Sequence, residues 1–243
     1  MSDMKKTALV TGANKGLGFE TALQLAQQGY TVWVGARDRD RGEKAVDILS
    51  SAGDVRLVSL DVTDEASISR AAAHIEAATG ALDVLVNNAG IAIPDGDGRP
   101  STVEVDALQR TLEVNVYGAL RVTQAFLPLL RRADAGRIVN VSSTLGSLGI
   151  LTSPENPFAE IPAFAYTSSK TLLNALTGWL AIELAATSIK VNSVCPGHNA
   201  TDMNGGVGAQ HPAEGAKVVV RAATLDADGP TGTFFDVDGT VPW

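Results

Sequence analysis

Tyr166 and Lys170 are four positions apart, and Ser143 lies 23 residues before the tyrosine. On a helix, residues i and i+4 share a face, so the two side chains can interact. A phenol with a pKa of roughly 10 is a poor base at neutral pH, and a nearby ammonium lowers that pKa by favouring the phenolate. Such a pair can act as a general acid/base, while a serine hydroxyl hydrogen-bonds the reacting oxygen. The alternative is an ordinary surface helix, because Tyr-x-x-x-Lys also occurs by chance.

A glycine-rich turn follows the first apolar run of the sequence. Residues 7–10 predict a buried parallel strand, and residues 16–28 predict a helix. Between them, Gly12, Gly16 and Gly18 are spaced G-x-x-x-G-x-G instead of the more common G-x-G-x-x-G. These glycines permit a tight turn, a close approach of the backbone to a pyrophosphate, and close packing of helix on strand. With a helix N-terminus facing the phosphates, the pattern predicts a dinucleotide site in preference to an ordinary strand–helix loop.

The residue after the second predicted strand indicates which dinucleotide binds. The predicted strand 31–36 is followed by Arg37, which lies 19 residues beyond Gly18. An acidic residue near this place holds the ribose 2′-hydroxyl of NAD, whereas a guanidinium suits the 2′-phosphate of NADP. Lys15 can supply a second cation, so we expect NADP(H) to be preferred, with NAD(H) as the alternative. Arg37 would otherwise be a solvated charge at a strand end, and we interpret Asp38 as a helix N-cap.

Strand and helix patterns alternate along the whole sequence. The predicted strands cover residues 7–11, 31–36, 55–61, 82–87, 137–142, 189–195 and 232–237. The predicted helices cover residues 16–28, 39–51, 64–79, 104–131, 163–186 and 212–224. This order predicts an α/β fold: a doubly wound (Rossmann) parallel sheet of about seven strands with helices on both faces. Without an internal repeat or a linker, we expect a single domain over residues 1–243.

The chemically interesting residues follow the predicted strands. The glycine turn, residues 88–90, Ser143 and residues 196–197 each come directly after a strand. In such sheets the ligand binds in the crevice at the carboxyl ends of the strands, so these segments should meet there. Asn115 lies instead within the long predicted helix 104–131, where a polar side chain on a buried face is usually a satisfied core group.

Several of these motifs together resemble the short-chain dehydrogenase/reductase family over essentially the whole chain. The matching motifs, in order, are the glycine turn, Asp61 between Leu60 and Val62, Asn87–Gly90, Asn115 between Val114 and Val116, Tyr166-x-x-x-Lys170, and Pro196–Gly197. Asn14–Lys15, Ala36–Asp38 and the Pro-Trp ending resemble the NADP-dependent carbonyl reductases of that family.

This resemblance implies catalytic roles for Asn115, Ser143, Tyr166 and Lys170. Tyr166 corresponds to the general acid/base, and Lys170 to the residue that lowers the tyrosine pKa and binds the nicotinamide ribose. Ser143, in preference to Ser142, corresponds to the serine that holds the substrate carbonyl oxygen. The backbone carbonyl of Asn115 would support a water in the proton relay.

The resemblance also implies a cofactor-binding set. The adenine contacts would be Asp61 and Val62, the wall beside the adenosine ribose would be Asn88–Gly90, and the nicotinamide segment would contain Pro196, Gly197 and Thr201. The full set is Gly12, Asn14, Lys15, Gly16, Leu17, Gly18, Arg37, Asp61, Val62, Asn88, Ala89, Gly90, Tyr166, Lys170, Pro196, Gly197 and Thr201.

Two segments of the chain are expected to shape the substrate site. Residues 198–212 resemble the substrate loop of the family, and we expect a lid that becomes ordered when cofactor or substrate binds. The connection from Ser143 to Tyr166 is longer than is usual in the family because of an insertion at about residues 150–162. Apolar residues in these segments favour a ketone, an aldehyde or a quinone as the substrate.

Composition limits the partners and the compartment. The chain has 243 residues, 45% of them hydrophobic, and a net charge of −8. The acidic balance argues against nucleic acid and against an anionic membrane surface as partners. Cys195, the only cysteine, fits a reducing cytoplasm and a buried structural thiol. The segment 1–6 does not predict a secretory signal, no run is long enough to span a bilayer, and isolated His198 and His211 predict no metal site.

The expected activity is hydride transfer between NADPH and a carbonyl compound, or the reverse oxidation of an alcohol. A different class, a sensor or scaffold that binds NADP without catalysis, would typically lack the tyrosine or the lysine. A sugar-nucleotide epimerase needs a larger C-terminal substrate domain than the roughly 45 residues that follow Gly197. The sequence leaves open whether the protein is a monomer or a homo-oligomer.

Overall fold

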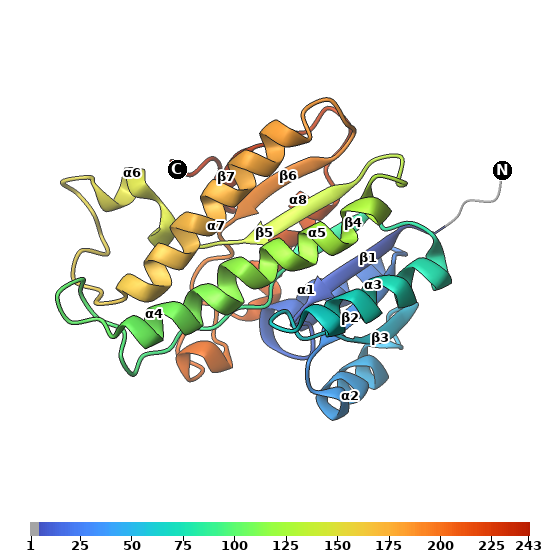
Figure 1. Cartoon of the computed structure of the whole chain (residues 1–243), viewed down its shortest axis with the longest axis horizontal. Helices are drawn as coiled ribbons and strands as arrows, with labels where there is room; N and C mark the ends of the chain where they lie inside the picture. The colour runs from blue at the N-terminus through green and yellow to red at the C-terminus, as the bar shows by residue number, and fades with distance from the viewer. Residues whose placement is uncertain (1–4) are drawn as a thin grey trace.

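The computed structural model describes residues 5–243, in which seven parallel strands form one sheet with the order β3-β2-β1-β4-β5-β6-β7 (Figure 1). The strands are β1 (Thr7–Thr11), β2 (Thr31–Ala36), β3 (Val55–Ser59), β4 (Val84–Asn87), β5 (Arg137–Val141), β6 (Lys190–Val194) and β7 (Thr233–Phe235). The strand order reverses between β1 and β4, which is where such sheets open a ligand crevice. Part of the segment 1–6, for which no signal peptide is predicted, lies outside the described residues.

All seven predicted strands are present, and the doubly wound parallel sheet is confirmed. Most end one or two residues earlier than predicted. The last strand stops at Phe235 because a turn follows it, in which the Asp236 carboxylate accepts hydrogen bonds from the backbone N–H groups of Asp238 and Gly239. Strands β1, β2 and β5 are buried along their entire length, as expected for a sheet covered on both faces.

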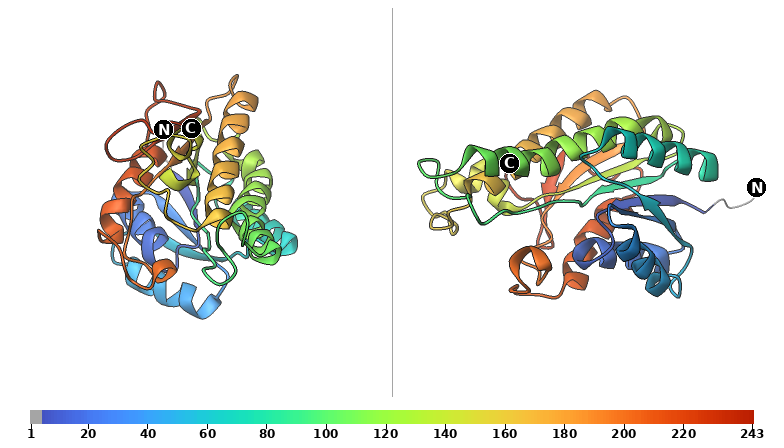
Figure 2. Two further views of the ribbon diagram at one scale, coloured as in Figure 1. Left: turned by 90° about the vertical axis from the view of Figure 1, so that its left-hand side faces the viewer. Right: turned by 60° about the horizontal axis from the view of Figure 1, so that its bottom comes forward.

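Helices cover both faces of the sheet (Figure 2). They are α1 (Gly16–Gln27), α2 (Arg39–Leu49), α3 (Glu65–Thr79), α4 (Val105–Leu112), α5 (Ala119–Leu130), α6 (Leu148–Leu151), α7 (Phe164–Glu183) and α8 (Pro212–Ala223). The apolar residues of α1, α2 and α8 form one core layer with the sheet, and those of α3, α5 and α7 form the other. Within residues 5–243, the structure has no helix with the length and apolar character needed to cross a membrane.

The predicted helix 104–131 is not continuous, and this expectation is wrong in detail. A π-helical turn at Glu113–Gly118 separates α4 from α5. Gly118 packs directly on Val62, since a Cβ atom on Gly118 would lie 2.8 Å from a Val62 methyl group. Such turns insert one residue into a helix and frequently occur at functional sites. Here the turn contains Asn115, one of the predicted catalytic residues.

Candidate active site

The glycine turn between β1 and α1 has the shape needed to hold a phosphate group. Gly12 and Gly16 adopt positive φ angles of 65° and 55°, which side chains rarely tolerate. A Cβ atom on Gly18 would lie 2.5 Å from the Asn88 side-chain nitrogen and 2.7 Å from the Gly12 carbonyl oxygen. No side chain caps the N-terminus of α1, and its first turn contains no acidic residue. Its free N–H groups therefore fit the pyrophosphate of a dinucleotide.

Residues after β4 form the wall next to this turn. The Thr11 hydroxyl accepts hydrogen bonds from the backbone N–H groups of Asn88 and Ala89, at 3.0 and 2.9 Å. The Asn88 side chain donates to the carbonyl oxygens of Thr11 and Gly12. These bonds fix residues 88–90 against the glycine turn, so the two predicted cofactor segments are adjacent. Asn14 and Leu17, also in the predicted set, are half-buried at the same turn.

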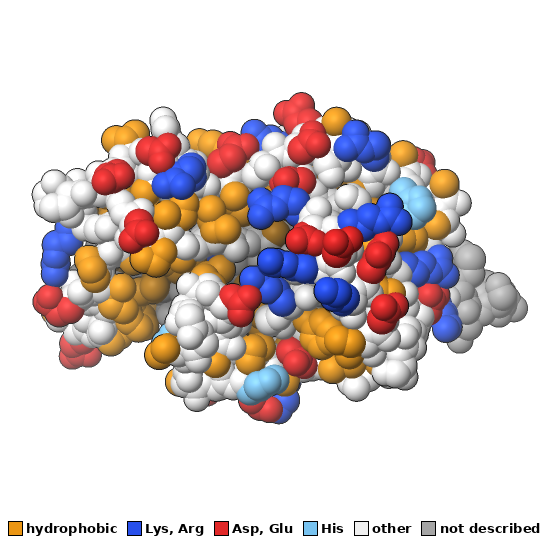
Figure 3. Space-filling model, turned by 90° about the horizontal axis from the view of Figure 1, so that it is seen from below, with side chains coloured by type: hydrophobic (Ala, Val, Ile, Leu, Met, Phe, Trp, Pro, Cys, Tyr) orange, Lys and Arg blue, Asp and Glu red, His pale blue; other side chains and the backbone are white. Residues whose placement is uncertain are grey.

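Arg37 lies at the end of β2, where the sequence predicts a 2′-phosphate site. Residues 37–41 line an open depression of about 510 Å³. Asp38 caps α2 by accepting a hydrogen bond from the Arg41 N–H group, as predicted. Among residues 5–243, no carboxylate lies within ion-pair distance of Arg37, so its guanidinium can take an anion. Lys and Arg side chains gather near the middle of the face drawn in Figure 3.

Lys15 has a partner that the sequence did not predict. Its Nζ atom lies 2.6 Å from a carboxylate oxygen of Asp202, 187 positions away in the substrate loop. The hydrogen bond from Lys15 lowers the pKa of the Asp202 carboxyl, and the charge of Arg41 acts in the same direction. Both side chains are exposed, so the pair is weak and can exchange for a phosphate. The loop therefore reaches the cationic side of the glycine turn.

The predicted adenine contacts lie after β3. The Asp61 carboxylate accepts hydrogen bonds from both the backbone N–H and the hydroxyl of Thr63. Val62 is buried and packs against Gly118. The structure thus places this segment between the β3 end and the π-helical turn, and its adenine contact stays a prediction.

Ser143, Tyr166 and Lys170 meet at the junction of β5 and α7. The Lys170 Nζ atom donates a 2.9 Å hydrogen bond to the Val141 carbonyl oxygen and lies 5.5 Å from the centroid of the Tyr166 ring. A 3₁₀ turn, Thr144–Gly146, follows Ser143 and packs on α7 so closely that a Cβ atom on Gly146 would lie 2.6 Å from the Lys170 backbone. The segment that carries Ser143 is therefore held against the helix that carries Tyr166 and Lys170 by contacts that involve the backbone.

Burial determines the protonation of this pair. It raises the pKa of Tyr166 to about 12; the nearby Cys195 acts in the same direction, and a hydrogen bond with Ser143 acts against it. Burial also lowers the pKa of Lys170 to about 8, with Cys195 acting against this shift. The tyrosine pKa is thus raised instead of lowered as predicted, because the cost of burying the phenolate is the largest effect. The tyrosine is a proton donor at neutral pH.

Asn115 is fully engaged through its side chain. Its amide oxygen accepts a 2.8 Å hydrogen bond from the Ile91 N–H group, and its amide nitrogen donates to the Ile91 carbonyl and the Ser169 hydroxyl. Gly90 lies beside it, since a Cβ atom there would be 3.3 Å from the Asn115 amide oxygen and 3.7 Å from the Lys170 Nζ atom. Asn115 thus connects the cofactor wall to α7, while the role of its backbone carbonyl in a proton relay stays a prediction.

The substrate loop, residues 198–212, is closed at its base. Asn199 donates hydrogen bonds to the carbonyl oxygens of Pro196 and Gly197, and Gln210 donates to Pro196 and to Asn199. Within the loop, Thr201 approaches the glycine turn, since a Cβ atom on Gly16 would lie 3.5 Å from its methyl group. The loop therefore begins at the predicted nicotinamide segment and passes over the predicted pyrophosphate site.

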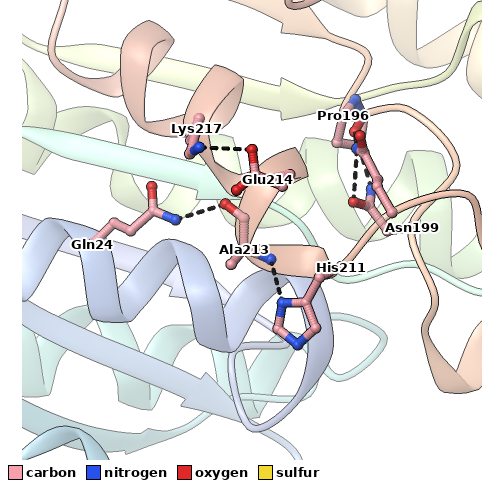
Figure 4. A network of polar contacts seen from close by, with 8 residues as sticks. Gln24, Pro196, Asn199, His211, Ala213, Glu214 and Lys217 are labelled. Atoms are coloured by element: carbon pink, nitrogen blue, oxygen red, sulfur yellow. Dashed lines mark hydrogen bonds and ion pairs between the residues drawn. The ribbon is translucent and has the colours of Figure 1, made fainter.

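The end of the loop is anchored to α1 (Figure 4). His211 caps α8, because its Nδ1 atom accepts a hydrogen bond from the Ala213 N–H group. Gln24 of α1 donates a 2.8 Å hydrogen bond to the Ala213 carbonyl oxygen. The histidine is thus a helix cap, and the described part of the chain contains no cluster of metal-ligating side chains.

Asp97 is a site residue that the sequence interpretation missed. Its carboxylate accepts hydrogen bonds from the backbone N–H groups of Ala165 and Tyr166, at 2.8 and 3.2 Å. It thereby caps the first turn of α7, which no local side chain does. The only signal was an aspartate within the turn-forming run Pro94–Gly98, which does not reveal a helix about 70 positions away.

A buried polar chain, also unpredicted, ties α7 to the sheet. The Asn140 side chain accepts a hydrogen bond from Asn87 and donates to Thr177, whose hydroxyl lies 2.8 Å from that of Ser193. The four residues come from β5, β4, α7 and β6 in turn. Because every link is buried, the chain fixes the position of α7 relative to the sheet.

Comparisons with known proteins agree with this geometry. A family model described as short chain dehydrogenase matches residues 6–212. The short-chain dehydrogenase anuI of Penicillium roqueforti (strain FM164) is 39% identical over 229 residues, with 90% of this chain and 89% of that protein covered. Salutaridine reductase of Papaver bracteatum is 36% identical over 294 aligned positions, with 95% of this chain and 94% of that protein covered.

A solved structure shares the fold over nearly the whole chain. NADPH-bound carbonyl reductase from chicken fatty liver matches with a TM-score of 0.85 and 28% identity, covering 98% of this chain and 99% of that chain. The chain therefore belongs to the short-chain dehydrogenase family.

Proposed function

We propose that this protein is an NADP-dependent oxidoreductase that reduces the carbonyl group of a ketone, an aldehyde or a quinone, or oxidises the corresponding alcohol. The observation that carries the proposal is the meeting of Ser143, Tyr166 and Lys170 beside a glycine turn shaped for a dinucleotide. Relatives with similar sequences are named as reductases, among them salutaridine reductase and mouse carbonyl reductase [NADPH] 1.

The chain's own residues supply proton transfer and orientation. The nicotinamide of the bound cofactor supplies or accepts the hydride. Ser143 donates a hydrogen bond to the substrate oxygen, and Tyr166, protonated at neutral pH because burial raises its pKa, gives its proton to the same oxygen. Lys170 stays beside the tyrosine through its bond to Val141, and it stabilises the phenolate formed after the transfer.

NADP is the proposed cofactor because two cationic residues lie where its 2′-phosphate would bind. Arg37 lines the depression after β2. Lys15 lies in the glycine turn, where its Nζ atom forms an ion pair with the exposed Asp202 carboxylate. NAD remains the alternative. The chicken carbonyl reductase that shares this fold was solved with NADPH.

The decisive experiment follows oxidation of NADPH and NADH at 340 nm against a panel of ketones, aldehydes and quinones. The expected result is turnover that prefers NADPH. Tyr166→Phe should abolish turnover, because the phenyl ring carries no proton to donate, while NADPH affinity stays within a few-fold of the original. Undiminished turnover in this variant would show that Tyr166 is not the proton donor.

The remaining expectations are part of the same proposal. No observation in residues 5–243 favours a sensor or scaffold without catalysis, since the tyrosine and the lysine are both in place. A small-molecule substrate in the cytoplasm is expected, with the chain as monomer or homo-oligomer. Size-exclusion chromatography with light scattering would determine the oligomeric state.

A further inference from the structure

The chain folds back after β7 and lies against the segment that follows Ser143. We call Thr240–Trp243 the return segment. Its Val241 N–H group donates a 2.8 Å hydrogen bond to the Phe234 carbonyl oxygen, and Thr240 forms an antiparallel bridge with Phe235. The Trp243 ring stacks on that of Phe234, with centroids 5.8 Å apart and planes at 29°. The return segment is thus held to the sheet by backbone bonds and by an aromatic contact.

Helix α6 depends on this segment for its position. The Ser147 hydroxyl, which is fully buried, donates a 2.6 Å hydrogen bond to the Pro242 carbonyl oxygen and accepts one from the Ile150 N–H group. The Gly149 N–H group donates a 2.6 Å hydrogen bond to the main-chain oxygen of Trp243. There is no room for a side chain at Gly149, because a Cβ atom would lie 2.9 Å from the Pro242 side chain.

A small apolar cluster completes the contact. Cys195, Phe234 and Val241 are buried together, and Ile150 of α6 packs against them. Helix α6 has only four residues and buries none of them fully, so it cannot be stable on its own. Its fixed position is therefore due to the return segment and this cluster.

This short helix is attached directly to the proposed site. It begins five residues after Ser143, and the intervening turn packs on Lys170. Leu148 and Leu151 are about half exposed, at 53% and 48%, so α6 offers apolar surface beside the site.

We propose that the return segment determines substrate specificity, by holding α6 so that Leu148 and Leu151 contact the apolar body of a carbonyl substrate. Ser147, Gly149 and Trp243 are then positioning residues. This inference rests on the proposed function and adds the substrate class, a carbonyl compound with an apolar group larger than a short alkyl chain.

The test compares kcat/KM for acetophenone and for propanal with NADPH in the original protein, Trp243→Ala, Gly149→Ala and Trp243→Phe. We expect the ratio of kcat/KM for acetophenone to that for propanal to fall about tenfold in Trp243→Ala and in Gly149→Ala. This is the effect expected when one apolar contact with the substrate is lost. The loss should be mainly in KM, with unchanged NADPH affinity, and Trp243→Phe should restore the ratio because it keeps the stack. Trp179→Ala, which removes a tryptophan that is 71% exposed on α7, is the matched control.

Hydrogen exchange of residues 147–152 supplies a readout that needs no activity. We expect faster exchange there in Trp243→Ala than in Trp179→Ala, with equal protection of α1. Faster exchange with an unchanged substrate ratio would overturn the specificity role, and unchanged exchange would overturn the positioning role. If the original protein reduced no carbonyl compound, the proposed function and the specificity role would fail, while exchange would still decide whether the return segment holds α6.

Discussion

The Lys170 ammonium donates its hydrogen bond to the Val141 carbonyl oxygen, at the end of the strand that leads into Ser143. With the packing of Gly146 on the Lys170 backbone, this contact joins the helix that carries the proton donor to the loop that carries the serine. It also fixes the lysine in a buried place, where the charged form is costly and its pKa falls to about 8. Burial also raises the pKa of Tyr166 to about 12, so the tyrosine keeps its proton where the lysine loses its own.

The rate of reduction should therefore depend on the protonation of Lys170. As pH rises through about 8 the ammonium is lost, whereas Tyr166 still carries its proton, so we expect kcat/KM for reduction to decline above that pH. In Lys170→Arg, whose guanidinium stays protonated, the decline should move to higher pH. Profiles of kcat/KM against pH for both proteins test this. A level profile for the original protein up to about pH 10 would show that the lysine charge is not required.

Cofactor preference should depend on Arg37. Arg37→Asp removes a charge-assisted contact to the 2′-phosphate and repels that group, so the NADPH-to-NADH ratio of kcat/KM should fall by about 10- to 100-fold. Arg70→Asp, on the exposed surface of α3, makes the same charge change elsewhere and should leave the ratio unaltered. An unchanged ratio in the Arg37 variant would mean that the 2′-phosphate binds at other residues.

Asp97 should position Tyr166 through the backbone. Asp97→Ala leaves two N–H groups of the first turn of α7 without their acceptor. We therefore expect the free energy of unfolding to fall by about 1 kcal/mol. We also expect kcat to fall by a larger factor than the affinity for NADPH. Asp97→Asn keeps an amide oxygen and should recover part of both. Asp95→Ala, in the same turn but exposed, is the control. Denaturant unfolding and steady-state kinetics measure the two effects, and equal losses in the two alanine variants would exclude a specific role.

The substrate loop should gain protection when the cofactor binds. We expect slower hydrogen exchange in residues 200–209 with NADPH bound, while the loop base, held by Asn199 and Gln210, is protected throughout. Asp202→Asn weakens the link to Lys15, so exchange before NADPH addition should be faster than in the original protein. Comparable protection with and without NADPH would count against a lid.

The sequence predicted the sheet well for a physical reason. Strands β1, β2 and β4 are mainly apolar runs, and parallel strands that are buried on both faces leave that pattern clearly. The segments of the site could also be predicted, because residues that follow parallel strands must emerge at the same edge of the sheet. Burial of Cys195 and the helix cap at Asp38 were predicted correctly on similarly local grounds.

What the sequence did not predict depends on contacts between distant segments. Asp97 and Asp202 act on partners far along the chain, and no local pattern pairs them. The π-helical turn arises where Gly118 packs on Val62, which a continuous helical pattern conceals. The direction of the Tyr166 pKa shift depends on how deeply the pair is buried, a quantity that spacing alone does not give.

The return segment has a second consequence, for the behaviour of the protein in concentrated solution. An edge strand with free backbone groups is a template on which another chain can add and start aggregation. On β7 that template is blocked, because Thr240 and Val241 already pair with Phe235 and Phe234. At the opposite edge, β3 carries Arg56 in an ion pair with Asp54, and such charges discourage the same kind of pairing. The sheet is thus protected from growing at either side.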